Sequence, residues 1–386
     1  LTDAASARAA TGSYIPDQIS PLALSWSVSV QREITPHTVI EFRYLGTKGM
    51  NLPVQMRLNA APVVSSALVL PTFLNQPDVT QLAGLPTLGD ALATTGVGVR
   101  PLAADGFTTN LTSYQFLGRS RYDSGSVSIN HRMSKGLAFT GAYTWSATLD
   151  NATNEFNSSA INPRRPQNFS DLRNEWARSA LDIPHRVAVS FSYDVPFFNS
   201  LSNRFMRSAF GGWQVNGIFQ AQSGQPITVL SGLDSNLNGD SVADRAILNP
   251  SGIAGTGSGV TPIDVNGLPV AMNSPATVAY VANNPNAQYI TAGPGAQSTA
   301  GRNTLRTLGF NRTDALLSKT FEFGERGKSV RFGAEVFDLF NQQPRTVSGV
   351  GAMTGAFATA GNPFFNNYSN GTYSGRMLQL RAKITF

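Results

Sequence analysis

The stretch Leu22-Ala-Leu-Ser-Trp-Ser-Val-Ser-Val-Gln31 decides the fold class of this 386-residue chain. Large apolar side chains occupy every second position from Leu22 to Val30, and alanine, serine or glutamine fills the positions between them. Successive side chains of a β-strand point to opposite faces of its sheet. The stretch therefore predicts a strand with one apolar and one polar face.

The same alternation returns along the rest of the chain, and helical spacing is rare. Segments of this kind lie at 40–44, 126–133, 137–145, 186–193, 213–222, 307–323, 330–336 and 377–386. Together with 22–31 they predict about nine strands, joined in hairpins. The sequence thus predicts an all-β, antiparallel fold.

The predicted connections alternate between short and long. Short turns lie near 35–37, 134–136 and 324–328, with a medium one at 195–210. Long loops rich in Gly, Pro, Asn and Ser cover roughly 46–120, 148–183, 224–305 and 342–373. Loops of this length are unusual in a compact soluble domain, whereas short turns at one end and long loops at the other are typical of transmembrane β-barrels.

The composition of the two faces indicates which solvent each face meets. Only 13% of the residues are charged, against about 25% in ordinary globular chains. The polar faces carry mainly Ser, Thr, Asn and Gln, which suit a lumen, and the apolar faces suit outer-membrane lipid. We therefore expect an antiparallel transmembrane β-barrel with short periplasmic turns and long extracellular loops. A secreted β-sandwich or β-solenoid array is the alternative. Lys319 falls on the apolar face, so either the register slips there or the side chain reaches away from the lipid.

Several classes of protein are excluded by what the sequence lacks. There is no cysteine, which removes disulfide scaffolds and thiolate sites. The net charge of +6 is spread along the chain without a basic run, so we expect no nucleic-acid partner. The three histidines match no zinc motif, and no hydrolase, nucleotide-binding or metalloprotease motif occurs, so we expect no enzyme. No apolar run approaches the ~18 residues that a transmembrane helix needs.

Several motifs carry a family resemblance. The segment Val330-Arg-Phe-Gly-Ala-Glu-Val-Phe-Asp-Leu-Phe-Asn341 resembles the penultimate strand of TonB-dependent outer-membrane receptors. The C-terminal strand resembles the signal that the outer-membrane barrel-assembly machinery reads; its residues are Leu378, Leu380, Ala382, Ile384 and Phe386. Three more motifs make the chain similar to the Oar-like subgroup: Tyr143-Thr-Trp-Ser146, Asp182-Ile-Pro-His-Arg186, and Gly211-Gly-Trp213 leading to Ser223-Gly-Gln-Pro226.

The resemblance implies a larger protein. Such receptors close 22 strands around a plug, and bacterial barrels of one chain have an even strand number. About nine strands are therefore expected to be only part of a barrel. We interpret residues 1–386 as the C-terminal portion, without the plug, the N-terminal domain or the segment that contacts TonB.

The implied function is an active-transport receptor in the outer membrane of a Gram-negative-type bacterium. It would bind a small nutrient, whose identity the sequence does not give, through its extracellular loops. A passive outer-membrane barrel and a secreted β-rich adhesion or binding protein are the alternatives.

One loop has the beginning of a calcium-binding pattern. Asp234, Asn236 and Asn238 stand at alternate positions and Gly239 takes the sixth position, as in an EF-hand-like loop. Position twelve is Arg245 in place of the usual glutamate, with Asp244 one residue earlier. The candidate calcium ligands are Asp234, Asn236, Asn238, Asp240 and Asp244. The alternative is an Asx-rich loop whose side chains bond their own backbone.

A second group of loop residues is aromatic. Phe364, Phe365, Tyr368 and Tyr373 lie in or beside the last long loop. They either stack on a flat ligand such as a sugar, or form an interfacial girdle or pack within the loops.

Overall fold

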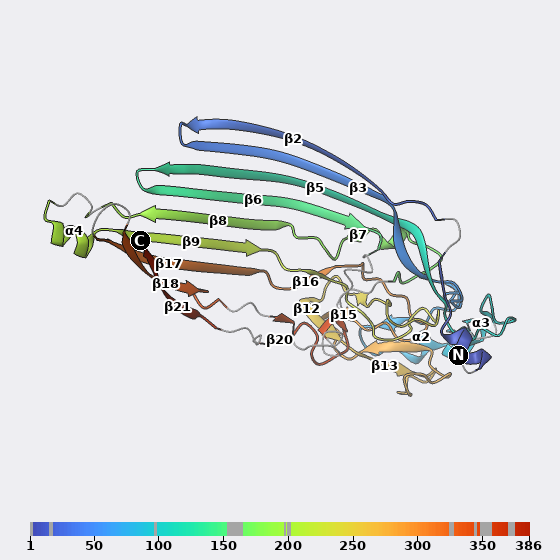
Figure 1. Ribbon diagram of the computed structural model, residues 1–386. Helices are drawn as coiled ribbons and strands as arrows, with labels where there is room; N and C mark the ends of the chain where they lie inside the picture. The colour runs from blue at the N-terminus through green and yellow to red at the C-terminus, as the bar shows by residue number, and fades with distance from the viewer. Residues whose placement is uncertain are drawn as a thin grey trace.

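The computed structural model describes residues 3–14, 18–95, 99–152, 165–196, 198, 202–323, 328–342, 346–347, 357–369 and 375–386. Within these residues nine long strands form one antiparallel sheet, in which each strand lies beside its neighbours in the sequence (Figure 1). They are β2 (Leu22–Thr35), β3 (Thr38–Arg57), β5 (Thr112–Ser134), β6 (Leu137–Asp150), β8 (His185–Asp194), β9 (Trp213–Gln222), β17 (Phe310–Glu322), β18 (Ser329–Phe337) and β21 (Met377–Thr385). The short strands β1 (Gly12–Tyr14) and β7 (Ala177–Arg178) pair with β5 and β6.

Tight turns join the strands at one end of the sheet. Between β5 and β6, Lys135 and Gly136 have φ of 50° and 82°, which is the left-handed geometry that two-residue hairpin turns use. A side chain on Gly136 would also meet the Asp194 carbonyl oxygen at 2.6 Å. The medium connection between β8 and β9 contains helix α4 (Arg204–Phe210). Residues 324–327 of the predicted turn at 324–328 lie outside the described residues.

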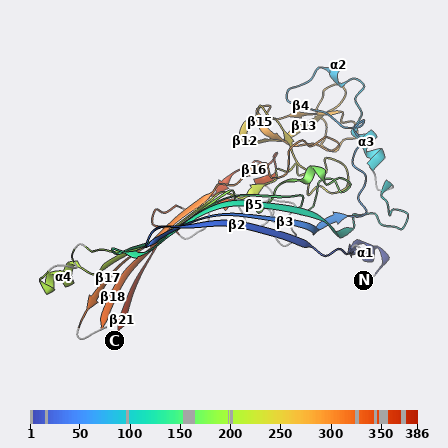
Figure 2. The same cartoon turned by 90° about the horizontal axis from the view of Figure 1, so that it is seen from above.

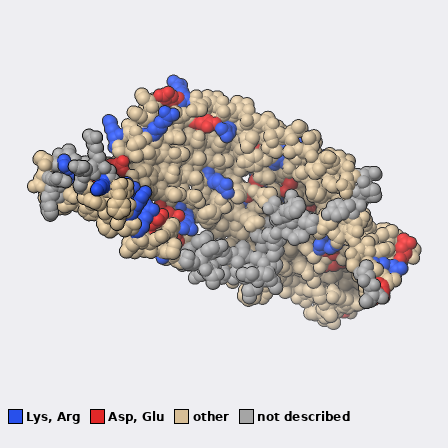
Figure 3. Space-filling view, viewed as in Figure 1, with Lys and Arg blue, Asp and Glu red and all other residues tan. Residues whose placement is uncertain are grey.

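The strand register places the apolar side chains of neighbouring strands in common rows. One row runs through Val30, Phe42, Val127, Tyr143, Val187 and Ala221. The row on the opposite face runs through Ser29, Arg43, Ser126, Thr144, Arg186 and Gln222. Exposed apolar side chains thus line one face of the whole sheet, and the prediction of two-faced antiparallel strands is confirmed. The view in Figure 3 shows how sparse charged side chains are on the visible surface.

Lys319 lies on the apolar face, as its position in the alternation predicts. It pairs in register with Trp213 on β9 and Phe332 on β18. Its Nζ donates hydrogen bonds to the carbonyl oxygens of Ala209 at 2.7 Å and Gly211 at 2.9 Å. The register therefore does not slip; the side chain reaches the carbonyls at the turn end of the sheet.

Two strands extend much further than the sequence predicts. β3 continues to Arg57 and β5 begins at Thr112, so the predicted loop at 46–120 is wrong at both ends. The apolar alternation is broken there by Gly46, Gly49 and Asn51, and the register shifts between Gly49 and Val54 absorb the irregular residues. Pairing with the neighbouring strand maintains the strand where the periodic pattern is lost.

The long connections fold into a body of their own at the other end of the sheet (Figure 2). We call this part the loop body; it contains the small sheets β10–β16, β11–β15–β12, β13–β14–β4 and β19–β20. Their strands are β4 (Thr72–Phe73), β10 (Pro226–Ile227), β11 (Ile247–Leu248), β12 (Ile253–Ser258), β13 (Val260–Ile263), β14 (Ala279–Ala282), β15 (Ala287–Ile290), β16 (Leu305–Arg306), β19 (Thr346–Val347) and β20 (Tyr368–Ser369). Helices α2 (Val79–Leu82) and α3 (Leu88–Thr95) and the 3₁₀ helix η3 (Arg173–Glu175) lie in the same connections. A further short element is α1 (Ala4–Ala9).

The loop body has the apolar core that the membrane-type sheet lacks. Tyr280, Tyr289, Ile290, Leu70 and Leu88 are at most 1% exposed. Tyr280 also donates a hydrogen bond to the Pro294 carbonyl oxygen at 2.7 Å, so its hydroxyl is satisfied in the core. Burial of such large side chains stabilises a water-soluble fold, which explains how these long connections hold a defined shape.

The main sheet is open in the described residues. β2 pairs there only with β3, and β21 pairs only with β18. Among the described residues, no helix is long and apolar enough to cross a membrane.

Candidate functional site

A polar pocket lies in the loop body, where four segments meet. Its volume is about 490 Å³. Its walls come from the segments 63–69, 167–175, 236–245 and 296–301. The polar lining side chains include Gln167, Glu175, Asn236, Arg245 and Ser298, and valines and alanines supply the apolar part.

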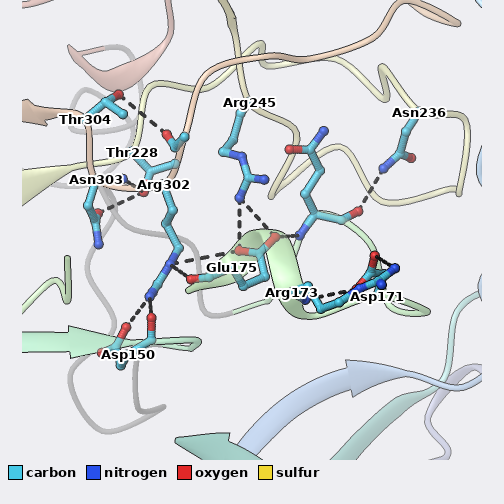
Figure 4. Close-up of polar contacts among 12 residues, drawn as sticks. Asp150, Asp171, Arg173, Glu175, Thr228, Asn236, Arg245, Arg302, Asn303 and Thr304 are labelled. Carbon is cyan, nitrogen blue, oxygen red and sulfur yellow. Dashed lines mark hydrogen bonds and ion pairs between the residues drawn. The ribbon is translucent and has the colours of Figure 1, made fainter. Parts of the chain in front are cut away.

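Glu175 organises the pocket. It ends η3 and is almost fully buried, and Nη1 of Arg245 lies 2.9 Å and 3.0 Å from its two carboxylate oxygens (Figure 4). The backbone N–H of Gln167 donates to the same carboxylate at 3.1 Å. A buried carboxylate is tolerated when it is paired and hydrogen-bonded, and this one is both.

Arg302 connects the pocket to the wall of the sheet. Its Nε donates to the Glu175 carbonyl oxygen at 3.0 Å, and its Nη2 donates to the Asp150 carbonyl oxygen at 2.5 Å and to the Asp150 carboxylate. Asp150 is the last residue of β6, so this buried guanidinium joins the loop body to a strand of the main sheet (Figure 4). The pocket is therefore anchored to the sheet.

Three polar atoms that line the pocket have no hydrogen-bond partner among the described residues. They are Oε1 of Gln167, Nε of Arg245 and Oγ of Ser298, and each is buried. A buried polar atom without a partner costs roughly 1–3 kcal/mol, so such atoms are rare unless water or a ligand satisfies them. The walls of the pocket thus contain a donor, an acceptor and a hydroxyl that no described residue satisfies.

The predicted calcium loop forms one side of the same region. Its side chains mostly bond their own backbone: Asp234 accepts from the Gly239 N–H at 2.8 Å, Asn236 from Asn238 at 3.0 Å, and Asn238 from Asp240 at 2.9 Å. The last two of these bonds, each to the backbone two residues on, are those of Asx turns. The amide nitrogens of Asn236 and Asn238 both donate to the Gln167 carbonyl oxygen, at 2.8 Å and 3.0 Å. The loop therefore positions the segment that carries Gln167 and Glu175.

The five candidate calcium ligands lie in one loop, but their side chains differ in their partners. Asp240 is paired with Arg57 at 3.3 Å and Arg165 at 2.7 Å, so its charge is already compensated. Oδ1 of Asp234 and Oδ1 of Asp244 are buried and have no partner among the described residues. Within the described part of the chain, no three His, Cys, Asp or Glu side chains group as a metal site. Calcium binding stays a prediction, and it rests on Asp234 and Asp244.

Asp244 is the most perturbed group in this region. Its carboxylate is fully buried and accepts the backbone N–H groups of Ser235 and Asn236. Burial raises its pKa to about 8, despite these hydrogen bonds and with a smaller push from the neighbouring Asp234 and Asp240. Burial likewise raises the pKa of Asp234 above its usual value.

The aromatic candidates take separate positions. Phe365 packs edge-on against Tyr289 at 6.0 Å between ring centroids, and Tyr368 packs edge-on against Phe357 at 5.0 Å. Phe364 is exposed, and Tyr373 lies outside the described residues. The two packed rings are thus part of the loop body. Among the described residues, Phe364, Phe365 and Tyr368 do not line the polar pocket.

The C-terminal residues lie on the apolar face of β21. Leu378, Leu380, Ala382 and Ile384 pair in register with Val336, Ala334, Phe332 and Val330 of β18. Phe386 is 91% exposed. Recognition of this strand by the assembly machinery stays a prediction.

The sequence alone did not reveal the pocket residues. In the sequence, Arg245 is only the residue that departs from the calcium pattern. No sequence motif includes Glu175, Gln167 or Ser298. The one available signal was the position of Arg245 directly after Asp244 in a motif-like loop. Its partner Glu175 lies 70 residues away, which no local pattern can connect.

Comparison with known families shows which family of proteins the chain belongs to. A family model described as an outer membrane beta barrel domain matches residues 2–379. The chain belongs to the outer membrane beta barrel domain family. This membership confirms the predicted fold class and the predicted localisation in the outer membrane, and the exposed apolar face of the barrel strands is its lipid-facing surface.

Solved structures similar to this barrel chain include outer-membrane transport proteins. The outer membrane transporter YddB from Escherichia coli has 10% identity and a TM-score of 0.42, over 97% of this chain and 34% of YddB. FpvA of P. aeruginosa bound to heterologous pyoverdines has 9% identity and a TM-score of 0.38, over 94% of this chain and 27% of FpvA. The ferric-catecholate import receptor Fiu of E. coli K12 has 11% identity and a TM-score of 0.22, over 95% of this chain and 40% of Fiu. The chain thus spans well under half the length of these proteins. No curated protein matches the chain.

Proposed function

We propose that this barrel chain is part of an outer-membrane active-transport receptor. Its loop body binds a nutrient in the polar pocket, and energy relayed by TonB drives import through the lumen. The observation that carries this proposal is the pocket with three unpartnered polar atoms, anchored to β6 through Arg302 and Asp150. The chemistry is binding and gating, with no covalent step.

We also propose that the nine strands are the C-terminal part of a larger barrel. The open sheet supports this: β2 and β21 each have a partner strand on one side only among the described residues. An unpaired strand edge in lipid leaves backbone N–H and C=O groups without partners, so a membrane sheet has to close. Further strands, with the plug and the TonB-contacting segment, complete the receptor in this proposal.

The Oar-like assignment belongs to the same proposal. Its motif Asp182-Ile-Pro-His-Arg186 has a clear structural role, since the fully buried Asp182 carboxylate accepts from the Thr148 N–H at 2.7 Å and pairs with Arg306. This motif thus fastens β6 to the strand β16 of the loop body.

The pocket favours an uncharged polar ligand. Glu175 and Arg245 are the charged residues in its lining, and they neutralise each other. The remaining polar lining offers amide and hydroxyl groups beside valine and alanine surface. Hydroxyl-rich or amide-rich compounds, such as oligosaccharides and short peptides, match this mixture of hydrogen-bonding and apolar contacts.

One experiment distinguishes three possible functions: a transport receptor, a passive barrel and an adhesion protein. Purified full-length receptor is screened in detergent by thermal shift against neutral oligosaccharides, short peptides and ferric siderophores. Uptake of the best binder is then measured in cells with and without tonB. Binding with TonB-dependent uptake supports the proposal, and uptake that persists without TonB would identify a passive barrel. Absence of uptake in both strains, despite binding, would favour adhesion.

A further inference from the structure

A second pocket lies on the outside of the barrel wall, at the loop end of the strands. It is lined by Trp26, Lys48, Arg119, Ser120, Arg121 and Trp176 and has a volume of about 510 Å³. We call Trp26, Lys48, Arg119, Arg121 and Trp176 the rim cluster. Two indoles and three cations gather here in a chain with only 13% charged residues.

The strand register places the rim cluster on the lipid-facing side. Lys48 pairs with Leu24 on β2 and with Arg121 on β5, so these residues share one face. Two residues further along β2, Trp26 continues the apolar row of Leu22, Leu24, Val28 and Val30. The indole of Trp26 lies flat on β3 above Gly46, where a Cβ would come within 2.3 Å of it. The cluster is therefore outside the lumen.

The height of the rim cluster matches the outer boundary of the membrane. Lys48 is ten residues from Thr38, where β3 leaves its short turn. A tilted transmembrane strand needs about 9–11 residues to cross the hydrocarbon core. Tryptophan is typical of the boundary between lipid and water, and Trp26 and Trp176 are both exposed at this level.

The charges of the rim cluster are largely uncompensated. Arg121 pairs with Asp123 at 2.6 Å, and Asp123 also accepts the Tyr44 hydroxyl at 2.7 Å. Neither Lys48 nor Arg119 forms an ion pair with any described residue, and both are exposed. Three cations thus face one carboxylate at a surface that meets lipid head groups.

We propose that the rim cluster binds the phosphorylated head group of a glycolipid in the outer leaflet. Lys48 and Arg119 contact phosphate oxygens, and Arg121 adds its remaining guanidinium donors. Guanidinium groups suit phosphate because their planar donors match two of its oxygens at once. Trp26 and Trp176 pack against the sugar rings or the first acyl carbons, for which indole has both an apolar face and a polar N–H. Lipid would then hold the receptor at a fixed depth, independently of the nutrient pocket.

The test measures binding of purified lipopolysaccharide to the full-length receptor in neutral detergent. The double variant Lys48→Gln/Arg119→Gln is compared with Arg32→Gln. Arg32 pairs in register with Ile40 and so lies on the same face at the opposite, short-turn end of β2. Each basic residue near an anionic surface contributes about 1 kcal/mol, so the double variant should bind roughly 30-fold more weakly. Arg32→Gln should bind like the unaltered receptor.

Two further arms identify the chemical source of the binding. The same glycolipid after enzymatic removal of its phosphates should bind weakly to all variants, and millimolar inorganic phosphate should not compete. Equal binding by the double variant, or undiminished binding of the dephosphorylated glycolipid, would overturn the proposal. The melting temperature of each variant is recorded; if the double variant is misfolded, Lys48→Gln alone, which changes one exposed side chain, decides the result by the same criterion.

Discussion

Arg245 and Glu175 form a buried ion pair in which one guanidinium nitrogen lies within 3.0 Å of both carboxylate oxygens. The two residues come from different long connections of the barrel, the first from 224–305 and the second from 148–183. Their pairing is what turns two separate loops into the wall of one pocket.

The first prediction concerns this pair. Arg245→Met should destabilise the loop body by about 3–5 kcal/mol, because it leaves the Glu175 carboxylate buried without its cation. We expect faster proteolysis of the segments 165–175 and 236–245 than in the unaltered protein. Arg173→Met is the matched control: Arg173 begins the 3₁₀ helix that Glu175 ends, and it pairs with Asp171 just before that helix, but it is 89% exposed. Exposed pairs add little stability. Equal proteolysis of both variants would show that the buried pair does not hold the loops.

The second prediction concerns the unpartnered atoms of the pocket. Ser298→Ala removes a hydroxyl without a partner among the described residues, so the melting temperature should stay unchanged or rise slightly. Binding of the best oligosaccharide or peptide from the thermal-shift screen should weaken by roughly tenfold, as expected for one lost hydrogen bond of about 1 kcal/mol or more. Calorimetry measures both effects. Unchanged affinity in Ser298→Ala would place the ligand elsewhere on the receptor.

The third prediction concerns calcium. Millimolar calcium should protect the loop 234–245 from proteolysis, because the cation would occupy the unpartnered oxygens of Asp234 and Asp244. Asp234→Asn should remove most of this protection. Asp264→Asn, at an exposed turn of the same loop body, should keep it. If calcium leaves the cleavage rate unchanged in the unaltered protein, the loop is an Asx-rich turn without metal.

The fourth prediction concerns Lys319. Lys319→Met should lower the free energy of unfolding by about 1.5–3 kcal/mol, since the charged Nζ hydrogen-bonds two carbonyl groups at the turn that follows α4. Methionine fits the apolar face, so the loss reflects these hydrogen bonds and not a new charge in lipid. Lys383→Met, on the polar face of β21, serves as the control and should have little effect. Urea unfolding in lipid vesicles measures the difference, and similar midpoints would contradict the assigned role.

Local alternation in the sequence was enough to predict the wall of the barrel. Val28 and Tyr44 meet across β2 and β3 because each lies on the apolar face of its own strand, and that face can be recognised from neighbouring residues. Even Lys319, which breaks the pattern, kept its predicted place. The upper halves of β3 and β5 were missed because glycines and Asn51 interrupt the pattern, whereas hydrogen bonding to the partner strand continues.

The loop body and its pocket could not be predicted from local alternation. Leu70 and Tyr280 lie in one core although 210 residues separate them, and neither belongs to a periodic segment. Glu175 and Arg302 are joined across more than a hundred residues by a hydrogen bond to a carbonyl group. Contacts of this range depend on the folded arrangement of all the connections, so a single sequence does not contain a local sign of them.

The lengths of β3 and β5 have a consequence for what the loop body can reach. They contain 20 and 23 residues, about ten more than a crossing requires. At about 3.3 Å per residue, the surplus is on the order of 30 Å of paired strand standing beyond the membrane. One flank of the barrel therefore projects from the membrane as a paired β-ribbon, and this ribbon holds the loop body away from the lipid surface. A ligand too bulky to approach the lipid closely would still reach the pocket.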